Sequence, residues 1–138
     1  MDDIVIIYTD GACVPNPGKG GWGATMQYKD TIKEFSGTDD LTTNNRMEMQ
    51  AAIEALSRLT RPCKVKIYSD SKYLVDGFTK WFPNWKKQRK TGYLNQDLWL
   101  KLDIVAAPHN IEWQWVKGHS GNPGNERAND LAESAARR

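Results

Sequence analysis

Cysteine and long apolar runs are both scarce in this chain of 138 residues, and each shortage argues against a class of protein. The two cysteines, Cys13 and Cys63, lack metal-ligand spacing and do not suit a disulfide scaffold, which favours a reduced, cytoplasmic protein. No apolar run is long enough to span a membrane, and the acidic N-terminus leads straight into a strand pattern instead of a signal peptide. We therefore expect no membrane partner.

Internal repeats, linkers and heptads are also absent from the sequence. The length suits one unit with a core of its own, so we expect a single domain over residues 1–138. Because there is neither a heptad pattern nor an obvious apolar patch, the default expectation for the oligomeric state is a monomer.

Acidic residues are missing from residues 80–93, although the whole chain has a net charge of only +2. This stretch, KWFPNWKKQRKTGY, is strongly basic, which leaves the remainder of the chain mildly acidic. Trp81 and Trp85 interleave with lysines that include Lys86 and Lys87, and aromatic rings beside cations are typical of nucleic-acid binding. The alternative is a tryptophan pair packed as local core beneath a solvated, charged loop.

Apolar patterning predicts an α/β fold, with a five-stranded mixed sheet flanked by helices. The first three strands are expected to form an antiparallel meander. Strands are expected at residues 4–10, 22–28, 31–37, 65–70 and 111–116, and helices at 44–59, 71–82, 96–107 and 125–138. The Pro/Gly-rich stretches 13–23 and 118–124 are expected to be loops, and Pro83 is expected to end the second helix.

Three acidic residues are candidates for one site. Asp10 and Asp70 each close an apolar strand, and the carboxyl ends of parallel strands meet at the edge of a sheet where α/β proteins bind ligands. Glu48 lies on the apolar face of helix 44–59, where a carboxylate needs a partner. The aspartates repel it, whereas a divalent cation serves all three, and an oxygen-rich ligand set favours Mg²⁺ or Mn²⁺.

Each carboxylate also has a simpler explanation. Either aspartate alone is consistent with a solvated strand-end residue that caps the following turn or helix. Glu48 can form an ion pair with Arg46 or Arg58, although helical geometry points both arginines to other sides of the helix. The metal site is the hypothesis that accounts for all three carboxylates together.

Six stretches of the sequence carry a resemblance to a known family: YTDGACVPNPGKGGWG, TTNNRMEMQAAIEAL, YSDSKYL, WFPNWKK, NQDLW and EWQWVKGHSGNPGNERAN. Together, in the same order and over essentially the whole chain, they resemble bacterial ribonuclease H type 1. The resemblance implies a ribonuclease H-like fold and endonucleolytic cleavage of the RNA strand of RNA–DNA hybrids, with 5′-phosphomonoester products. It also implies two divalent ions, Mg²⁺ or alternatively Mn²⁺, bound by residues that match Asp10, Glu48 and Asp70.

The fourth acidic residue of that family is missing here. By resemblance it stands three residues after Glu126, where this chain has Asn129. The periodicity of the last helix places Asn129 at the edge of the buried stripe and turns Asp130 toward water, in the same sector as Glu133. An amide oxygen ligates Mg²⁺ without adding charge, so we expect weaker metal binding at one position and less repulsion in the metal-free site.

The resemblance implies roles for further residues. His119, in a glycine-rich loop, matches a proton-shuttling histidine. Lys72 replaces a substrate-binding glutamine of some members, and Leu41 stands where many have an arginine in a pocket for a DNA phosphate. His109 lacks such a context and is expected to be ordinary surface. The other implied substrate contacts are Thr43 and Asn95 in the phosphate pocket, Cys13, Asn16, Asn44 and Asn45 in the minor groove, and Trp81, Trp85, Lys86 and Lys87 on a basic protrusion.

Two other functions stay open at this point. The first is a module that binds RNA–DNA hybrids but has lost cleavage because of Asn129. A metal-dependent nuclease of the same fold can act on another substrate, such as a DNA junction, although the tryptophan-rich basic stretch and TTNNRME argue against it.

Overall fold

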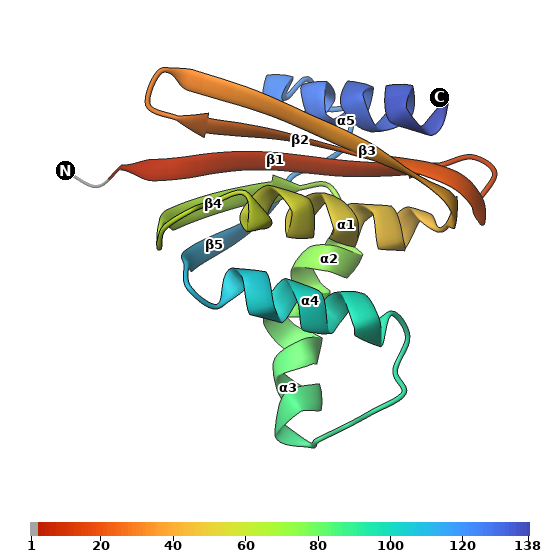
Figure 1. Cartoon of the computed structure of the whole chain (residues 1–138), viewed down its shortest axis with the longest axis vertical. Helices are drawn as coiled ribbons and strands as arrows, with labels where there is room; N and C mark the ends of the chain where they lie inside the picture. Colours follow the sequence, from red (N-terminus) through yellow and green to blue (C-terminus); the bar gives the residue numbers. More distant parts are fainter. Residues whose placement is uncertain (1–2) are drawn as a thin grey trace.

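The computed structural model describes residues 3–138. Its centre is a five-stranded mixed sheet in the order β3-β2-β1-β4-β5 (Figure 1). The first three strands are antiparallel, whereas β4 runs parallel to β1 and β5 runs parallel to β4, which confirms the predicted α/β sheet. The strands are β1 (Ile4–Cys13), β2 (Gly18–Tyr28), β3 (Thr31–Thr42), β4 (Lys64–Ser69) and β5 (Asn110–Trp115).

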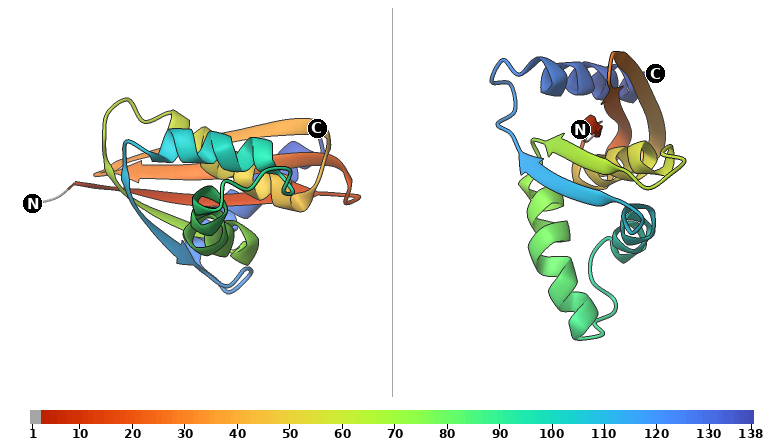
Figure 2. Two further views of the ribbon diagram at one scale, coloured as in Figure 1. Left: turned by 90° about the horizontal axis from the view of Figure 1, so that it is seen from below. Right: turned by 90° about the vertical axis from the view of Figure 1, so that its left-hand side faces the viewer.

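Helices cover both faces of the sheet. Helix α5 packs on one face, and α1 packs on the other with α4 beyond it (Figures 1 and 2). A π-helical turn, Gly77–Trp81, joins α2 to α3, and this continuous segment projects away from the body of the molecule. None of the helices in residues 3–138 has the length and apolar character needed to cross a bilayer. The helices are α1 (Asn44–Ser57), α2 (Lys72–Asp76), α3 (Phe82–Lys87), α4 (Gln96–Ala106) and α5 (Pro123–Ala136).

Glycines in β1 and β2 let the two large helices approach the sheet closely. A Cβ atom on Gly11 would lie 2.5 Å from the backbone nitrogen of Glu48 in α1. On the other face, a Cβ atom on Gly23 would lie 2.5 Å from the carbonyl oxygen of Ala128 in α5. Because no side chain separates backbone from backbone here, α1 and α5 both carry polar residues right up to β1.

Several predicted boundaries are wrong. Strand β1 continues to Cys13 and β3 continues to Thr42, beyond their expected ends. Strand β2 begins at Gly18, inside the stretch expected to be a loop, because its glycines pair with β1 and β3 while α1 and α5 pack on them. The second helix does not end at Pro83. Proline lies in the first turn of α3, where its missing N–H and fixed φ are tolerated, so the helical segment runs on to Lys87.

Candidate active site

Asp10 and Asp70 lie side by side because their strands are parallel and in register. Thr9 of β1 pairs with Ser69 of β4, and the next residue along each strand is an aspartate. Strand alternation places Asp10 on the face opposite to the buried Ile7, toward α5, and Asp70 directly follows the last residue of β4. Asp10 is only 2% exposed.

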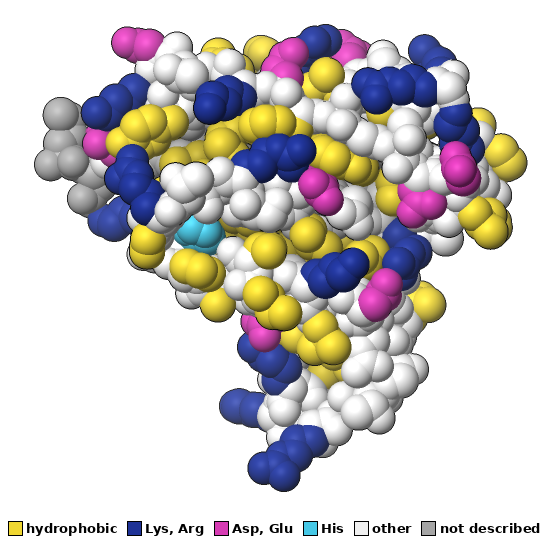
Figure 3. Space-filling view, viewed as in Figure 1, with side chains coloured by type: hydrophobic (Ala, Val, Ile, Leu, Met, Phe, Trp, Pro, Cys, Tyr) yellow, Lys and Arg dark blue, Asp and Glu magenta, His cyan; other side chains and the backbone are white. Residues whose placement is uncertain are grey.

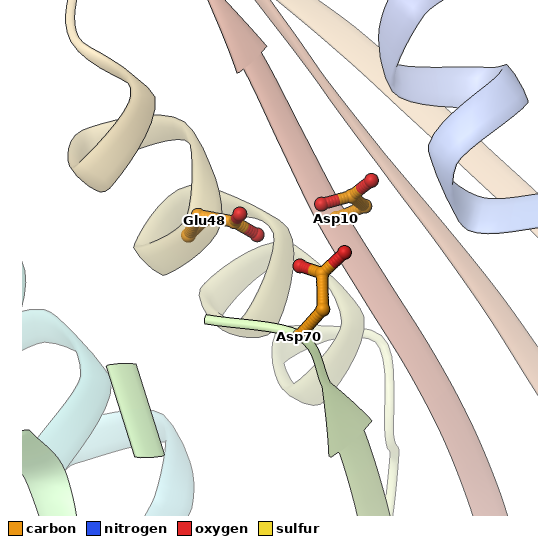
Figure 4. Close-up of side chains that lie close together, drawn as sticks. All are labelled: Asp10, Glu48 and Asp70. Carbon is orange, nitrogen blue, oxygen red and sulfur yellow. The ribbon is translucent and has the colours of Figure 1, made fainter. Parts of the chain in front are cut away.

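Glu48 reaches the same place from the second turn of α1. The hydroxyl of Thr43 caps this helix by accepting a hydrogen bond from the Arg46 backbone N–H at 3.2 Å. One ligand oxygen each from Glu48, Asp10 and Asp70 lie within 4.8 Å of one another, and Figure 4 shows the three carboxylates converging from α1, β1 and the end of β4.

The alternative ion pairs for Glu48 are not formed. Arg46 donates to both carboxylate oxygens of Asp97, at 3.0 and 2.7 Å, and Arg58 pairs with Glu54 at 3.1 Å. Glu48 Oε1 is buried without a hydrogen-bond partner among the described residues. A buried carboxylate oxygen without a donor fits a cation ligand better than a structural role.

Burial and mutual repulsion raise the pKa of Asp10 and of Glu48, so these two carboxyls hold their protons to higher pH when no cation is present. Burial, with repulsion from Asp70 second, raises the pKa of Asp10 from 3.8 to about 6, although hydrogen bonds from Asn129 and Gly11 oppose the shift. Burial, followed by the charges of Asp10 and Asp70, raises the pKa of Glu48 well above its ordinary value. A divalent cation would remove this repulsion and favour the ionised forms.

Asn129 lies against Asp10, and Asp130 does not. The Asn129 side-chain Nδ2 donates to Asp10 Oδ2 at 2.7 Å, whereas Asp130 is exposed on the other side of α5. This is the orientation that helical periodicity predicted. The amide therefore supplies a hydrogen bond to Asp10 at the position where the resemblance implies a fourth carboxylate.

A cavity of about 300 Å³ surrounds these groups and includes His119. His119 is exposed and has a left-handed backbone, with a φ of 55°. The loop that carries it lies close over Asp70, because a Cβ atom on the preceding Gly118 would be 2.7 Å from Asp70 Oδ2. Trp115 holds the other side of Asp70, since its indole N–H donates to the Asp70 carbonyl at 3.0 Å, and Lys72 lies 4.6 Å from the centre of that indole.

A second cavity, of about 430 Å³, brings together five of the predicted substrate contacts. The Asn44 backbone N–H donates to Asn16 Oδ1 at 3.2 Å, which joins the β1–β2 turn to the start of α1. Arg46 Nη1 donates to Asn95 Oδ1 at 3.2 Å and so joins α1 to the start of α4. Leu41 is 76% exposed and does not line this cavity. The five are Asn16, Thr43, Asn44, Asn45 and Asn95.

The Cys13 side chain is buried, so the substrate contact predicted for this position stays a prediction for its backbone. Its side chain is 3% exposed, and its thiol lies within 3.4 Å of the carbonyl oxygens of Pro15, Gly18 and Thr42. The thiol is therefore turned into the protein and cannot reach a minor groove. Only the backbone of this segment is available for such a contact, a distinction that residue type alone does not reveal.

The projecting segment from Gly77 to Lys87 is the protrusion, and its two tryptophans differ in their surroundings. Trp85 is partly buried against Tyr93, with ring centroids 4.6 Å apart, whereas Trp81 is 41% exposed. Lysine and arginine side chains gather along one side and the tip of the protrusion (Figure 3). Lys86 is paired with Asp103 at 3.2 Å, while Lys87 is exposed and has no ion pair among the described residues.

The surroundings of two residues, Glu133 and His109, differ from those predicted. Glu133, expected to face water beside Asp130, lines the cavity of the carboxylates. It lies one helical turn after Asn129, and this spacing is a signal that sequence reasoning passed over. His109, expected to be ordinary surface, is partly buried and accepts a hydrogen bond from the Cys63 backbone N–H at its Nδ1, at 3.1 Å.

Comparisons with known proteins agree with this architecture. The family model for RNase H matches residues 2–137. A ribonuclease H of Alcanivorax borkumensis is 57% identical over 133 residues, covering 93% of this chain and 88% of that protein. The crystal structure of LC9-RNase H1, a type 1 RNase H with the type 2 active-site motif, matches with a TM-score of 0.89 and 33% identity, over 99% of this chain and 73% of that one.

A more distant structure shares the fold. LC11-RNase H1, solved in complex with an RNA/DNA hybrid, matches with a TM-score of 0.74 and 23% identity, over 96% of each chain. At this level of identity, the structural similarity shows a shared fold and nothing more. The matches over nearly the whole length, together with the carboxylate cluster of Asp10, Glu48 and Asp70, lead to one conclusion. The chain belongs to the ribonuclease H family, in its bacterial type 1 group.

Proposed function

We propose that this ribonuclease H, which hydrolyses RNA in RNA–DNA hybrids, is an endonuclease that uses two Mg²⁺ ions held by Asp10, Glu48 and Asp70. The observation that carries the proposal is the convergence of three carboxylates, one of which has a buried oxygen without a partner among the described residues. Oxygen ligands of this kind suit Mg²⁺, with Mn²⁺ as an alternative. When bound, the ions would activate the attacking water and stabilise the leaving 3′-oxygen.

The remaining side chains of the cavity would position these groups and move protons. Asn129 orients Asp10 through its amide N–H and can offer an amide oxygen after rotation, but it adds no charge. His119 stands at the exposed mouth of the cavity, where an imidazole can carry a proton between the reacting groups and solvent. Trp115 and Gly118 enclose Asp70 and keep its carboxylate directed toward Asp10 and Glu48.

Recognition of the hybrid would use surfaces beside the cavity. Short amides at Asn16, Asn44 and Asn45 suit contact with base edges and 2′-hydroxyls, and Thr43 and Asn95 sit in the same cavity where a phosphate of the DNA strand would bind. Lys72 and the lysines of the protrusion, Lys86 and Lys87, would contact phosphates, while the exposed Trp81 offers a stacking face.

We also propose that the chain acts as a monomeric single domain in the cytoplasm. One cluster of buried apolar residues extends from the sheet into α1 and α4, and both cysteines are free. Light scattering at the elution peak of a sizing column would test the monomer, since a dimer would double the mass.

The lysines of the protrusion lead to a prediction about binding. Lys87→Ala should raise KM for the hybrid about threefold, leave kcat unchanged and reduce the slope of log affinity against log salt by about 1. Lys86→Ala should have a smaller effect, because Lys86 is already paired with Asp103. Lys33→Ala, on β3 at the opposite end of the molecule, is the control and should change neither quantity. Equal effects of all three would remove the protrusion from the binding surface.

Asn129→Asp tests the fourth position directly. The change should tighten Mg²⁺ binding about fivefold and raise kcat, because it restores a charge beside Asp10. It should also lower the stability of the metal-free protein, since a donor to Asp10 becomes a second repelling carboxylate. Isothermal titration with Mg²⁺ and thermal unfolding in chelator measure the two effects. Asp130→Asn is the matched control, and a loss of activity there would mean that α5 is placed incorrectly.

The proposed function is tested by cleavage of an end-labelled RNA–DNA hybrid, with matched RNA–RNA and DNA–DNA duplexes, in Mg²⁺, Mn²⁺ or chelator. Metal-dependent cutting of the hybrid's RNA strand alone is the expected result. Tight hybrid binding without cutting in either metal would support the alternative, a binding module in which the Asn129–Asp10 hydrogen bond has replaced a metal contact. Cutting in chelator would overturn the metal dependence.

A further inference from the structure

The last helix carries a carboxylate that the functions above do not use. Glu133 lies on α5 one turn beyond Asn129 and lines the cavity that contains Asp10, Glu48 and Asp70. Asp130, the neighbour of Asn129, is exposed and does not line it. Of the acidic residues on α5, Glu133 alone faces the carboxylate cluster.

The Glu133 carboxylate is held only weakly by its surroundings. Its ion-pair partner is Arg137, with a separation of 3.6 Å, and the two side chains are 43% and 77% exposed. A solvated pair at this distance holds its members weakly. Ala12, Val14 and Ala136 line the neighbouring cavity together with Glu133 and Arg137. Arg137 is therefore the one charged partner of Glu133 among the described residues of that cavity.

The site beside Glu133 has a shortage of negative charge on its α5 side. Asn129 is neutral and turns its N–H toward Asp10, so α5 presents a donor to the cluster where an acid would attract a cation. Glu48 Oε1 is buried without a partner among the described residues, which shows that the cluster is built to receive a positive group. On this face of α5, the acidic residue that lines the cavity is Glu133, one helical turn beyond Asn129.

We propose that Glu133 supplies, from one helical turn further along α5, the negative charge that Asn129 lacks, and thereby strengthens divalent-cation binding at the Asp10 side of the site. This inference rests on the proposed metal-dependent function. Glu133 is a positioning residue in this role, because it acts through the field it adds to the cavity and through Asp10, without contact to the reacting phosphate. Arg137 competes for the same carboxylate and weakens its effect on the cation.

The first measurement is Mg²⁺ binding to the protein without substrate, by isothermal titration. Glu133→Gln keeps the shape of the side chain and should weaken Mg²⁺ binding about threefold to tenfold. Asp130→Asn removes the same charge three residues earlier on the exposed side and should change the affinity less than about twofold. Equal weakening by both variants would mean that net charge alone matters, and it would overturn the specific role of Glu133.

A second pair of variants separates the electrostatic role from a structural one. Arg137→Gln frees the Glu133 carboxylate, so it should tighten Mg²⁺ binding, opposite in sign to Glu133→Gln. If the Glu133–Arg137 pair served only to stabilise the end of α5, both variants would lower the melting temperature and shift the affinity in the same direction. That result would contradict the proposal.

The decisive experiment is a double-mutant cycle with Asn129→Asp. If Glu133 compensates for the missing acid, Glu133→Gln should have less than about a twofold effect on Mg²⁺ affinity once position 129 is an aspartate. An undiminished effect would show that the two positions act independently and would overturn the compensation. Asp70→Asn isolates the underlying function, because if wild type and Asp70→Asn bind Mg²⁺ equally, the metal site itself is wrong and not merely the role of Glu133.

Discussion

Replacing Asp10 by asparagine should abolish cleavage of the hybrid and, at pH 7 without metal, make the fold more stable. Activity should fall by on the order of 10³-fold or more, because the change removes a charged oxygen ligand that is central to the cluster. Stability should rise by about 2–3 kcal/mol, because a buried carboxylate that repels Asp70 and Glu48 is replaced by a neutral group of the same shape.

The pH dependence of this effect follows from the direction of the pKa shift. The folded protein holds the Asp10 proton up to a pKa of about 6, whereas the unfolded chain releases it near 3.8. Between these values the unfolded state binds fewer protons, so the stability of the metal-free wild type falls as the pH rises. Glu48 acts in the same direction. The difference between the variant and the wild type should therefore be small below pH 4 and reach its maximum above pH 6.

Urea unfolding in chelator at several pH values measures this prediction. Asp30→Asn, in the exposed turn between β2 and β3, is the control and should shift neither activity nor the pH profile. Saturating Mg²⁺ should reverse the order of stability at pH 7, because only the wild type gains binding energy from the cation. A wild type whose metal-free stability is constant from pH 4 to pH 7 would contradict the picture of strained, repelling carboxylates.

Gly11→Ala should damage both the fold and the site. The new Cβ would lie 2.5 Å from the Glu48 backbone nitrogen and 2.6 Å from the Met47 carbonyl carbon, and neither backbone atom can move without shifting α1. We expect a loss of stability of about 1–3 kcal/mol or more from this overpacking. Because Glu48 would move away from Asp10 and Asp70, activity should fall about 10²-fold and Mg²⁺ affinity should fall with it.

A second glycine provides the comparison for Gly11→Ala. Gly92 has a φ of 72°, and a Cβ atom added there would have no other atom within 4 Å, so Gly92→Ala should cost only about 1 kcal/mol of backbone strain. Its activity and metal affinity should equal those of the wild type. If Gly11→Ala kept wild-type activity, the close contact between β1 and α1 would not be what positions Glu48.

Much of the fold and of the site follows from local patterns in the sequence. Alternating and continuous apolar runs predicted the strands, and each run ends at a residue whose position in space is set by its strand, so Asp10 and Asp70 were predictable neighbours. Helical periodicity placed Glu48 on the buried face of α1 and separated Asn129 from Asp130 on α5. These predictions succeeded because the period of an element fixes the direction of each side chain relative to its neighbours.

Local patterns in the sequence were enough to predict the element types, the neighbouring carboxylates of Asp10 and Asp70 and the orientation of Asn129. Four other features depend on long-range packing: the glycines before Gly23 form a strand, the helical segment continues past Pro83, the Cys13 thiol is turned inward, and Glu133 lines the cavity. Periodicity tells which face of an element a side chain occupies. What that face meets depends on how closely another element approaches, and here the approach is set by contacts between residues far apart in the chain.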